Sequence, residues 1–190
     1  DIAPTIYTMT PAGIICSGAV IGIDNSETGA TYQLRLNGVL NMGAAVNGTG
    51  SAISLGEQYL PGIYTAIATN MKGCSSLMNG EVEVNANPVA FNVTPSAAQC
   101  PPVKIGINGS ETGVNYILVL ENSIQIDTLQ GTGTALSFGA QTTSGNYTVL
   151  AYNAATLCKT EMNGTAVIKP APISYPMTPA GILCPGTPIG

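Results

Sequence analysis

The sequence contains no histidine and no tryptophan, and only 8% of its residues are charged. Without histidine, neither a Ser-His-Asp nor a Cys-His catalytic arrangement can form, and imidazole ligands for a metal are excluded. No Cys-x-x-Cys pair occurs, and the cysteines are too dispersed along the chain for a zinc site. We therefore expect a protein that is not an enzyme, with no catalytic residues, no cofactor and no bound metal.

Basic residues are also scarce. Five Lys and Arg stand against ten Asp and Glu, which gives a net charge of −5. Proteins that bind nucleic acid usually present clustered basic side chains, so nucleic acid is not an expected partner. The sequence has no apolar run of about 18 residues, so it predicts no membrane span. Hydrophobic residues still make up 45% of the chain, which is ample for a folded core.

The five cysteines indicate that the chain is a tandem repeat. Cys16, Cys100 and Cys184 lie 84 residues apart (100 − 16 and 184 − 100), and Cys74 and Cys158 have the same separation (158 − 74). Other motifs recur at nearly the same interval: Ser-Glu-Thr-Gly at 26–29 and 110–113, Gly-Thr-Gly at 48–50 and 131–133, and Gly-x-Tyr-Thr at 62–65 and 145–148. A fixed period of this length indicates one folding unit that has been copied.

We predict repeat 1 at residues 1–87, repeat 2 at 88–171, and the first strand and following turn of a third repeat at 172–190. Residues 175–184 match 7–16 better than 91–100, which suggests that two types of copy alternate. A lone first strand cannot bury its apolar face, so we expect the chain to be part of a longer protein. The alternative is a subunit whose extra strand completes a neighbouring molecule.

Alternating apolar and polar residues mark the strands within each repeat. Tyr32, Leu34 and Leu36 alternate with polar residues, and no segment shows a helical period of 3.6. The predicted strands are 5–10, 19–24, 30–36, 39–42, 51–55, 62–69 and 81–86 in repeat 1, and 89–94, 103–108, 114–121, 124–128, 134–138, 145–152 and 165–169 in repeat 2. Seven or so short strands in about 84 residues predict an all-β fold of tandem immunoglobulin-like β-sandwich repeats stacked head to tail.

Two tyrosines support the sandwich prediction. Tyr64 and Tyr147 each follow a glycine by two positions and open an apolar strand. An immunoglobulin-like sandwich places its tyrosine corner there, with the hydroxyl bonded back to the preceding turn. The alternative is a plain core aromatic residue. The predicted linkers, 85–88 and 169–172, are short and contain proline, which favours a rod over loosely tethered units.

The cysteines pose a geometric question. Cys16 is predicted in the turn after the first strand and Cys74 in the turn after the sixth, at opposite ends of a sandwich. A six-residue strand spans roughly 20 Å, whereas a disulfide needs Cα atoms within about 7 Å. We therefore predict the inter-repeat disulfide Cys16–Cys158, and keep Cys16–Cys74 with Cys100–Cys158, or free thiols, as alternatives. Cys100 and Cys184 would pair with later copies and Cys74 with an earlier copy. Because disulfides persist in oxidising compartments, these bonds predict a protein outside the cytoplasm.

The turn at Asp24, Ser26 and Glu27 resembles a calcium-binding turn at first. Repeat 2 has Asn108 in place of Asp24, one charge fewer, so a solvated loop is the preferred interpretation.

The order of these motifs resembles the tandem immunoglobulin-like or PKD-like repeats of very large surface proteins of Bacteroidota. The resemblance covers both full repeats and the partial third, although the Trp and Gly-Asp-Gly features of PKD domains are absent. It implies a long surface adhesin or fibre, often exported by the type IX secretion system and in some cases used in gliding. Proteins of this phylum carry O-glycans at Asp-Ser/Thr followed by an aliphatic residue, which implies Thr128 as an acceptor.

Three functions are compatible with these observations. The preferred one is a structural segment of an extracellular, disulfide-linked fibre or stalk, with neighbouring repeats as its partners. The second is an adhesive repeat that binds a surface glycan or another surface directly, with the outward side chains of Ile117 and Val119 as a candidate patch. The third is a non-catalytic accessory module of a secreted enzyme.

Overall fold

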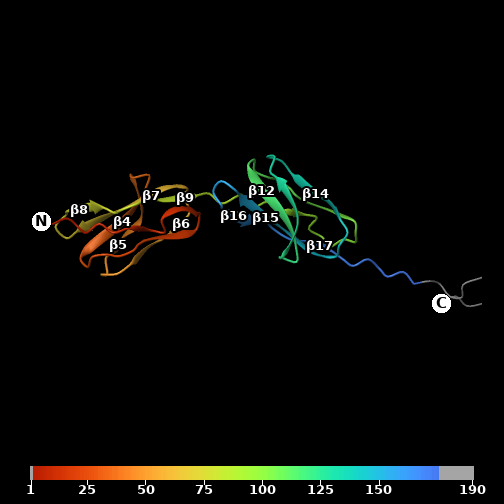
Figure 1. The fold of residues 1–190 in the computed structure, drawn as a ribbon, viewed down its shortest axis with the longest axis horizontal. Helices are drawn as coiled ribbons and strands as arrows, with labels where there is room; N and C mark the ends of the chain where they lie inside the picture. The colour runs from red at the N-terminus through yellow and green to blue at the C-terminus, as the bar shows by residue number, and fades with distance from the viewer. Residues whose placement is uncertain (1, 176–190) are drawn as a thin grey trace, which may run out of the picture.

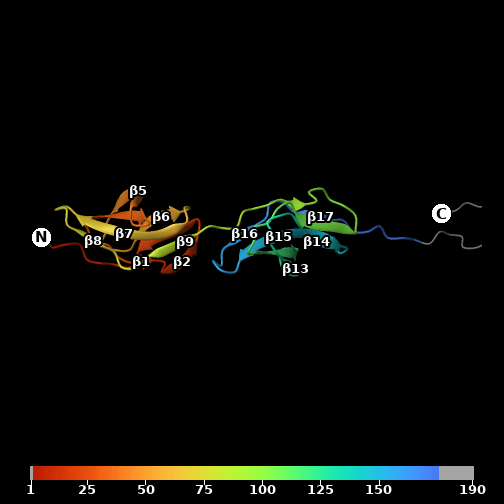
Figure 2. The same cartoon turned by 90° about the horizontal axis from the view of Figure 1, so that it is seen from above.

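The computed structural model describes residues 2–175 of the chain. Two β-sandwiches lie end to end, with the N-terminus at one end of the molecule and the C-terminal segment leaving the other (Figure 1). The view from above also shows them in line, joined by a short linker (Figure 2). No helix occurs among the described residues, which confirms the predicted all-β class, and none of these residues belongs to a helix that could cross a membrane.

Repeat 1 forms two facing sheets. The smaller sheet has the strand order β1-β3-β6, and the larger has the order β2-β9-β7-β4-β5, with β8 also pairing with β7. The strands are β1 (Met9–Thr10), β2 (Gly13–Cys16), β3 (Ala19–Ile23), β4 (Ala30–Leu36), β5 (Leu40–Asn47), β6 (Ile53–Gln58), β7 (Gly62–Asn70), β8 (Ser75–Leu77) and β9 (Val82–Asn85).

Repeat 2 has the same plan. Its smaller sheet has the order β10-β11-β14, and its larger sheet has the order β13-β12-β15-β16, with β17 also pairing with β15. The strands are β10 (Val93–Thr94), β11 (Val103–Ile107), β12 (Val114–Leu120), β13 (Ile124–Gln130), β14 (Leu136–Gln141), β15 (Gly145–Asn153), β16 (Lys159–Glu161) and β17 (Ala166–Ile168). The repeat boundaries at 87 and 171 remain predictions, and Cys184 lies outside the described residues.

Each sandwich has a core of its own. One cluster of buried side chains comes from residues 9–84 and the other from residues 93–168. Along β4, Tyr32, Leu34 and Leu36 are buried and alternate with more exposed residues, and β12 repeats this pattern. Full burial of one such aliphatic side chain contributes about 1.5–3 kcal/mol, so each repeat holds a core that does not depend on contact with its neighbour.

The structure adds strands that the sequence pattern did not predict. Gly13–Cys16 forms strand β2, not a turn, and pairs in parallel with β9. Ser75–Leu77 and Lys159–Glu161 form β8 and β16, which extend the larger sheets next to β7 and β15. Conversely, the first strand is shorter than predicted: β1 and β10 each have two residues. Strand β2 pairs with a strand far along the chain, whereas β8 and β16 pair with the strand directly before them. Each of the three added strands has only three or four residues, too few for its sequence to show a period.

The tyrosines in the two cores lead to a prediction about alkaline stability. Burial raises the pKa of Tyr32, Tyr64, Tyr116 and Tyr147 above the ordinary tyrosine value. A raised pKa in the folded state favours folding below the unfolded value of about 10, and this advantage disappears as the pH rises through the folded pKa. We expect a nearly constant Tm up to about pH 9 and a steep fall above about pH 10.

Tyrosinate absorbance and circular dichroism, recorded together against pH, would check this. Each phenol that stays neutral in the folded state lowers the free energy of unfolding by about 1.4 kcal/mol per pH unit, over the range between its unfolded and folded pKa. Ionisation of all the tyrosines in one step, with the fold intact, would contradict the expectation.

Candidate functional site: the joint between the two sandwiches

Strand β2 carries Cys16 to the end of repeat 1 that faces repeat 2. Thr10 belongs to the smaller sheet, and Gly13 already belongs to the larger one, where Cys16 pairs with Asn85 at the end of β9. The next residue is fixed as well, because the Ser17 N–H donates to Asn85 O at 2.8 Å and its hydroxyl donates to Tyr59 O at 2.9 Å. Cys16 therefore sits beside the point where the chain leaves the sandwich.

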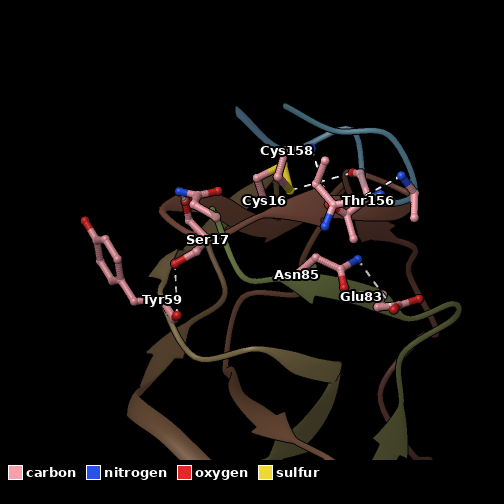
Figure 3. Close-up of a disulfide and its surroundings, with 10 residues drawn as sticks. Cys16, Ser17, Tyr59, Glu83, Asn85, Thr156 and Cys158 are labelled. Carbon is pink, nitrogen blue, oxygen red and sulfur yellow. Dashed lines mark hydrogen bonds between the residues drawn. A yellow bond between two sulfur atoms is a disulfide. The ribbon is translucent and has the colours of Figure 1, made fainter. Parts of the chain in front are cut away.

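The turn between β15 and β16 carries Cys158 to the facing end of repeat 2. Asn153 N–H donates to Cys158 O at 2.9 Å and closes this turn. The two sulfur atoms form a disulfide with a Cα–Cα distance of 5.6 Å (Figure 3). This is the inter-repeat pairing that the sequence favoured, and it removes the within-repeat alternatives for both cysteines. Cys158 is fully buried.

The linker beside the disulfide is bonded to both sandwiches. The Asn87 side chain donates to Ser17 O of repeat 1 at 3.0 Å. Pro88 is buried, as is Pro4 at the matching position of repeat 1. The N–H of Val89 donates to the Glu111 carboxylate of repeat 2 at 2.7 Å. We call this region the joint: Cys16, Ser17, residues 85–89, Glu111 and Cys158.

The Ser-Glu-Thr-Gly motif fixes the chain that enters each sandwich. Glu111 holds Val89 through its carboxylate, while its own N–H donates to Tyr116 Oη at 2.8 Å. In repeat 1 the carboxylate of Glu27 accepts the N–H of Thr5 at 3.1 Å and also bonds the Thr5 hydroxyl. Sequence reasoning found the motif but not this role. The equal spacing from Glu to Tyr in both copies corresponds to the bond between the Glu N–H and the Tyr hydroxyl, and it carries no signal for the bond to the linker.

The serine of the motif is buried, which corrects the prediction of a solvated loop. Ser110 Oγ donates to Thr134 O at 2.5 Å and accepts the Thr132 N–H at 3.0 Å. Ser26 makes the same two bonds with residues 49–51. A buried hydroxyl without partners would cost about 1–3 kcal/mol, so Ser-Glu-Thr-Gly and Gly-Thr-Gly recur together because they bond to each other.

Both predicted tyrosine corners have a bonded hydroxyl. Tyr64 Oη donates to Leu60 O at 2.8 Å, and Tyr147 Oη donates to Thr143 O at 2.9 Å. The preceding Gly62 has a φ of +144°, and a Cβ there would lie 2.6 Å from the Leu36 side chain. The Gly-x-Tyr motif is therefore structural: the glycine allows the close turn, and the tyrosine closes it.

The remaining candidate residues lie away from the joint. Asp24 accepts the N–H of Thr8 at 2.9 Å, and no group of three or more metal-ligating side chains occurs within residues 2–175. Ile117 and Val119 are half-buried on β12, between β13 and β15. Thr128 is exposed on the edge strand β13 and stays a predicted glycan acceptor.

Removing the Glu111 carboxylate should loosen the linker without unfolding the repeats. For Glu111→Ala we expect the amide of Val89 to exchange with deuterium at least tenfold faster, with a loss of roughly 1 kcal/mol in stability. Hydrogen exchange read by mass spectrometry or NMR would measure this. Glu161→Ala, an exposed carboxylate on β16 of the same repeat, is the control and should leave the Val89 amide unchanged. Equal protection in both variants would show that the carboxylate does not hold the linker.

No protein-family model matches the chain, and no curated protein matches it. Solved structures with a similar arrangement include the BSP domain of a biofilm associated protein (14% identity, TM-score 0.34), immunoglobulin domains 1–4 of Sidekick-1 (13%, 0.37) and murine CEACAM1b (12%, 0.35). The matches cover 88%, 88% and 86% of this chain and 30%, 47% and 98% of those structures. This chain thus spans less than half the length of the first two, and likenesses at these TM-scores assign no function.

Proposed function

We propose that the chain is a structural segment of an extracellular fibre or stalk, in which disulfide-joined β-sandwich repeats form a stiff rod. The observation that carries this proposal is the Cys16–Cys158 disulfide between the facing ends of two consecutive sandwiches. Disulfides persist in oxidising compartments, which supports an extracellular location.

The joint supports stiffness because it links the two bodies twice. A single linker would leave rotation about its backbone angles free. Here the linker and the disulfide are separate covalent connections, and hydrogen bonds tie Asn87 to repeat 1 and Val89 to repeat 2. A hinge motion has to break these bonds or distort the disulfide. This double connection supports a fixed arrangement of the two sandwiches, which lie in line in both views (Figures 1 and 2).

We favour a structural role over direct adhesion because the proposed adhesive residues, Ile117 and Val119, are half-buried. Large exposed apolar patches usually mark binding surfaces, and these two side chains do not form one. Membership in the Bacteroidota surface repeats, with neighbouring repeats as partners, is part of the proposal and rests on the sequence resemblance.

Small-angle X-ray scattering of the oxidised chain tests the rod. We expect the profile of one elongated particle with the cross-section of a single sandwich. A reductant that opens the disulfide should broaden the distribution of interdomain distances while far-ultraviolet circular dichroism stays constant. A compact oxidised particle, or identical scattering before and after reduction, would exclude a stiffening role for this disulfide.

A further inference from the structure

The two ends of the described rod each carry a free cysteine in a position that is bonded at the joint. Cys74 and Cys100 are free, whereas Cys158 and Cys16, their counterparts 84 residues away (158 − 74 and 100 − 16), form the disulfide. The described residues therefore contain both halves of a second joint, one at each end of the rod.

Cys100 has the backbone surroundings of Cys16. Gln99 pairs in parallel with Ile168, as the residue before Cys16 pairs with Val84 on β9. Gln99 N–H donates to Val167 O at 3.0 Å and Gln99 O accepts the Lys169 N–H at 2.9 Å, which anchors this segment to the end of β17. Cys100 is exposed at the end of repeat 2 that faces away from repeat 1.

Cys74 has the backbone surroundings of Cys158. Asn70 N–H donates to Cys74 O at 3.0 Å, as Asn153 N–H donates to Cys158 O at 2.9 Å. The Asn70 side chain also accepts the Cys74 N–H at 3.0 Å, so the turn is fixed before any partner binds. Cys74 is partly exposed, whereas Cys158 is fully buried within the joint.

The turn that carries Cys74 borders a hollow with two exposed apolar side chains. A hollow of about 470 Å³ opens at residues 70–72, in the turn that leads to Cys74, and Ile2 and Met71, which line it, are 90% and 91% exposed. Its lining comes from Ile2, Thr28, Gly29, Asn70, Met71 and Lys72. The matching turn of repeat 2, 153–158, faces repeat 1 in the joint (Figure 3). The surface around Cys74 is thus the one that a preceding sandwich would cover.

We propose that Cys100 of one molecule bonds to Cys74 of a second copy, so that the chain joins head to tail into a covalent filament. This rests on the proposed function, because it repeats the same joint between molecules. The two cysteines cannot pair within one molecule: they are separated by the lengths of β7 and β15 laid end to end, two nine-residue strands, or roughly 60 Å. A heterologous contact that repeats by translation does not close, and it generates an open filament.

The bond forms by thiol–disulfide exchange with a low-molecular-weight disulfide as oxidant. The Cys100 thiolate attacks this disulfide and releases one small thiol, leaving a mixed disulfide. The Cys74 thiolate of the second copy then attacks the Cys100 sulfur and releases the other small thiol. Two thiol protons and two electrons pass from the protein to the oxidant, which ends as two thiols.

The test uses the full chain with Cys184→Ser, so that Cys74 and Cys100 are the remaining free thiols. Concentrated protein is treated with oxidised glutathione and run on a non-reducing gel, and the cross-linked peptides are identified by mass spectrometry. We expect a ladder of multimers that contains the Cys74–Cys100 peptide. Adding Cys74→Ser or Cys100→Ser should abolish the ladder, and an equimolar mixture of these two variants should give dimers and nothing larger.

The absence of multimers, or cross-links that are mainly Cys74–Cys74 or Cys100–Cys100, would overturn the proposal. Each sample should also contain the Cys16–Cys158 peptide. If that peptide is present and the scattering of the monomer is still elongated, the rod stands although the head-to-tail bond fails. If that peptide is missing, the proposed function fails as well.

Discussion

Cys158→Ser is expected to uncouple the two repeats and to remove about 5 kcal/mol from the free energy of complete unfolding, because the native disulfide closes a loop with a sequence separation of 142. In the chain-entropy model this constraint acts on the unfolded chain, and it acts fully when both sandwiches are unfolded. The variant should therefore show two separate unfolding transitions, one for each core. In the oxidised protein the two repeats should unfold more nearly together.

Urea denaturation followed by circular dichroism would measure the loss. Cys74→Ser is the matched control, since it removes a free cysteine from the same turn of the other repeat. Its stability should stay within about 0.5 kcal/mol of the unaltered protein, as for most surface substitutions. If Cys158→Ser unfolds like Cys74→Ser, the disulfide does not couple the repeats, and the rod loses its main support.

The joint could be predicted largely because cysteine geometry is strict. The period of 84 made Cys158 the counterpart of Cys74 in the next repeat. The length of a strand exceeded the reach of a disulfide between Cys16 and Cys74 within one sandwich, so Cys158 was the preferred partner of Cys16. The prediction did not need the correct structure of the segment around Cys16, which is strand β2 and not a turn. The prediction required only that Cys16 and Cys74 lie at opposite ends of one sandwich.

Strand β2 itself could not be predicted from the sequence pattern. Four residues, Gly13–Cys16, pair in parallel with β9, which lies about seventy residues later in the chain. Such a short segment shows no alternation, since its burial changes gradually along the strand. In repeat 2 the pairing shrinks to the bridge between Gln99 and Ile168. Comparing the two copies therefore gave no common strand signal either.

The roles of Glu111 and Ser110 could be located but not interpreted from sequence. Both belong to a motif that recurs in each repeat, which marks them as important for the unit. Their function depends on partners about 22 positions away, Val89 and Thr132, and the backbone atoms of these partners carry no residue signature. A hydrogen bond from a side chain to a main-chain group is invisible to a comparison of residue types.

Gly131→Ala is expected to destabilise repeat 2 by about 3 kcal/mol, at the upper end of the cost of overpacking a tight core. A Cβ at this position would lie 1.9 Å from Glu111 O and 3.0 Å from the ring of Tyr116. The nearest obstacle is backbone, so no rotamer change can relieve it. Moving Glu111 away would also weaken its bonds to Tyr116 and to the Val89 amide in the linker.

Gly133→Ala, two residues further along the same motif, separates this clash from general glycine effects. Gly133 has a φ of +83°, and its Cβ would meet nothing closer than Thr112 Oγ1 at 3.5 Å. Its replacement should cost about 1–2 kcal/mol through backbone strain alone.

Gly48→Ala should reproduce the larger loss in repeat 1, where the Cβ would lie 2.0 Å from Glu27 O. If denaturant midpoints show no greater loss for Gly131→Ala than for Gly133→Ala, the close packing of the two motifs is not what holds the chain entering each sandwich. Faster exchange of the Val89 amide in Gly131→Ala, and not in Gly133→Ala, would connect that packing directly to the joint.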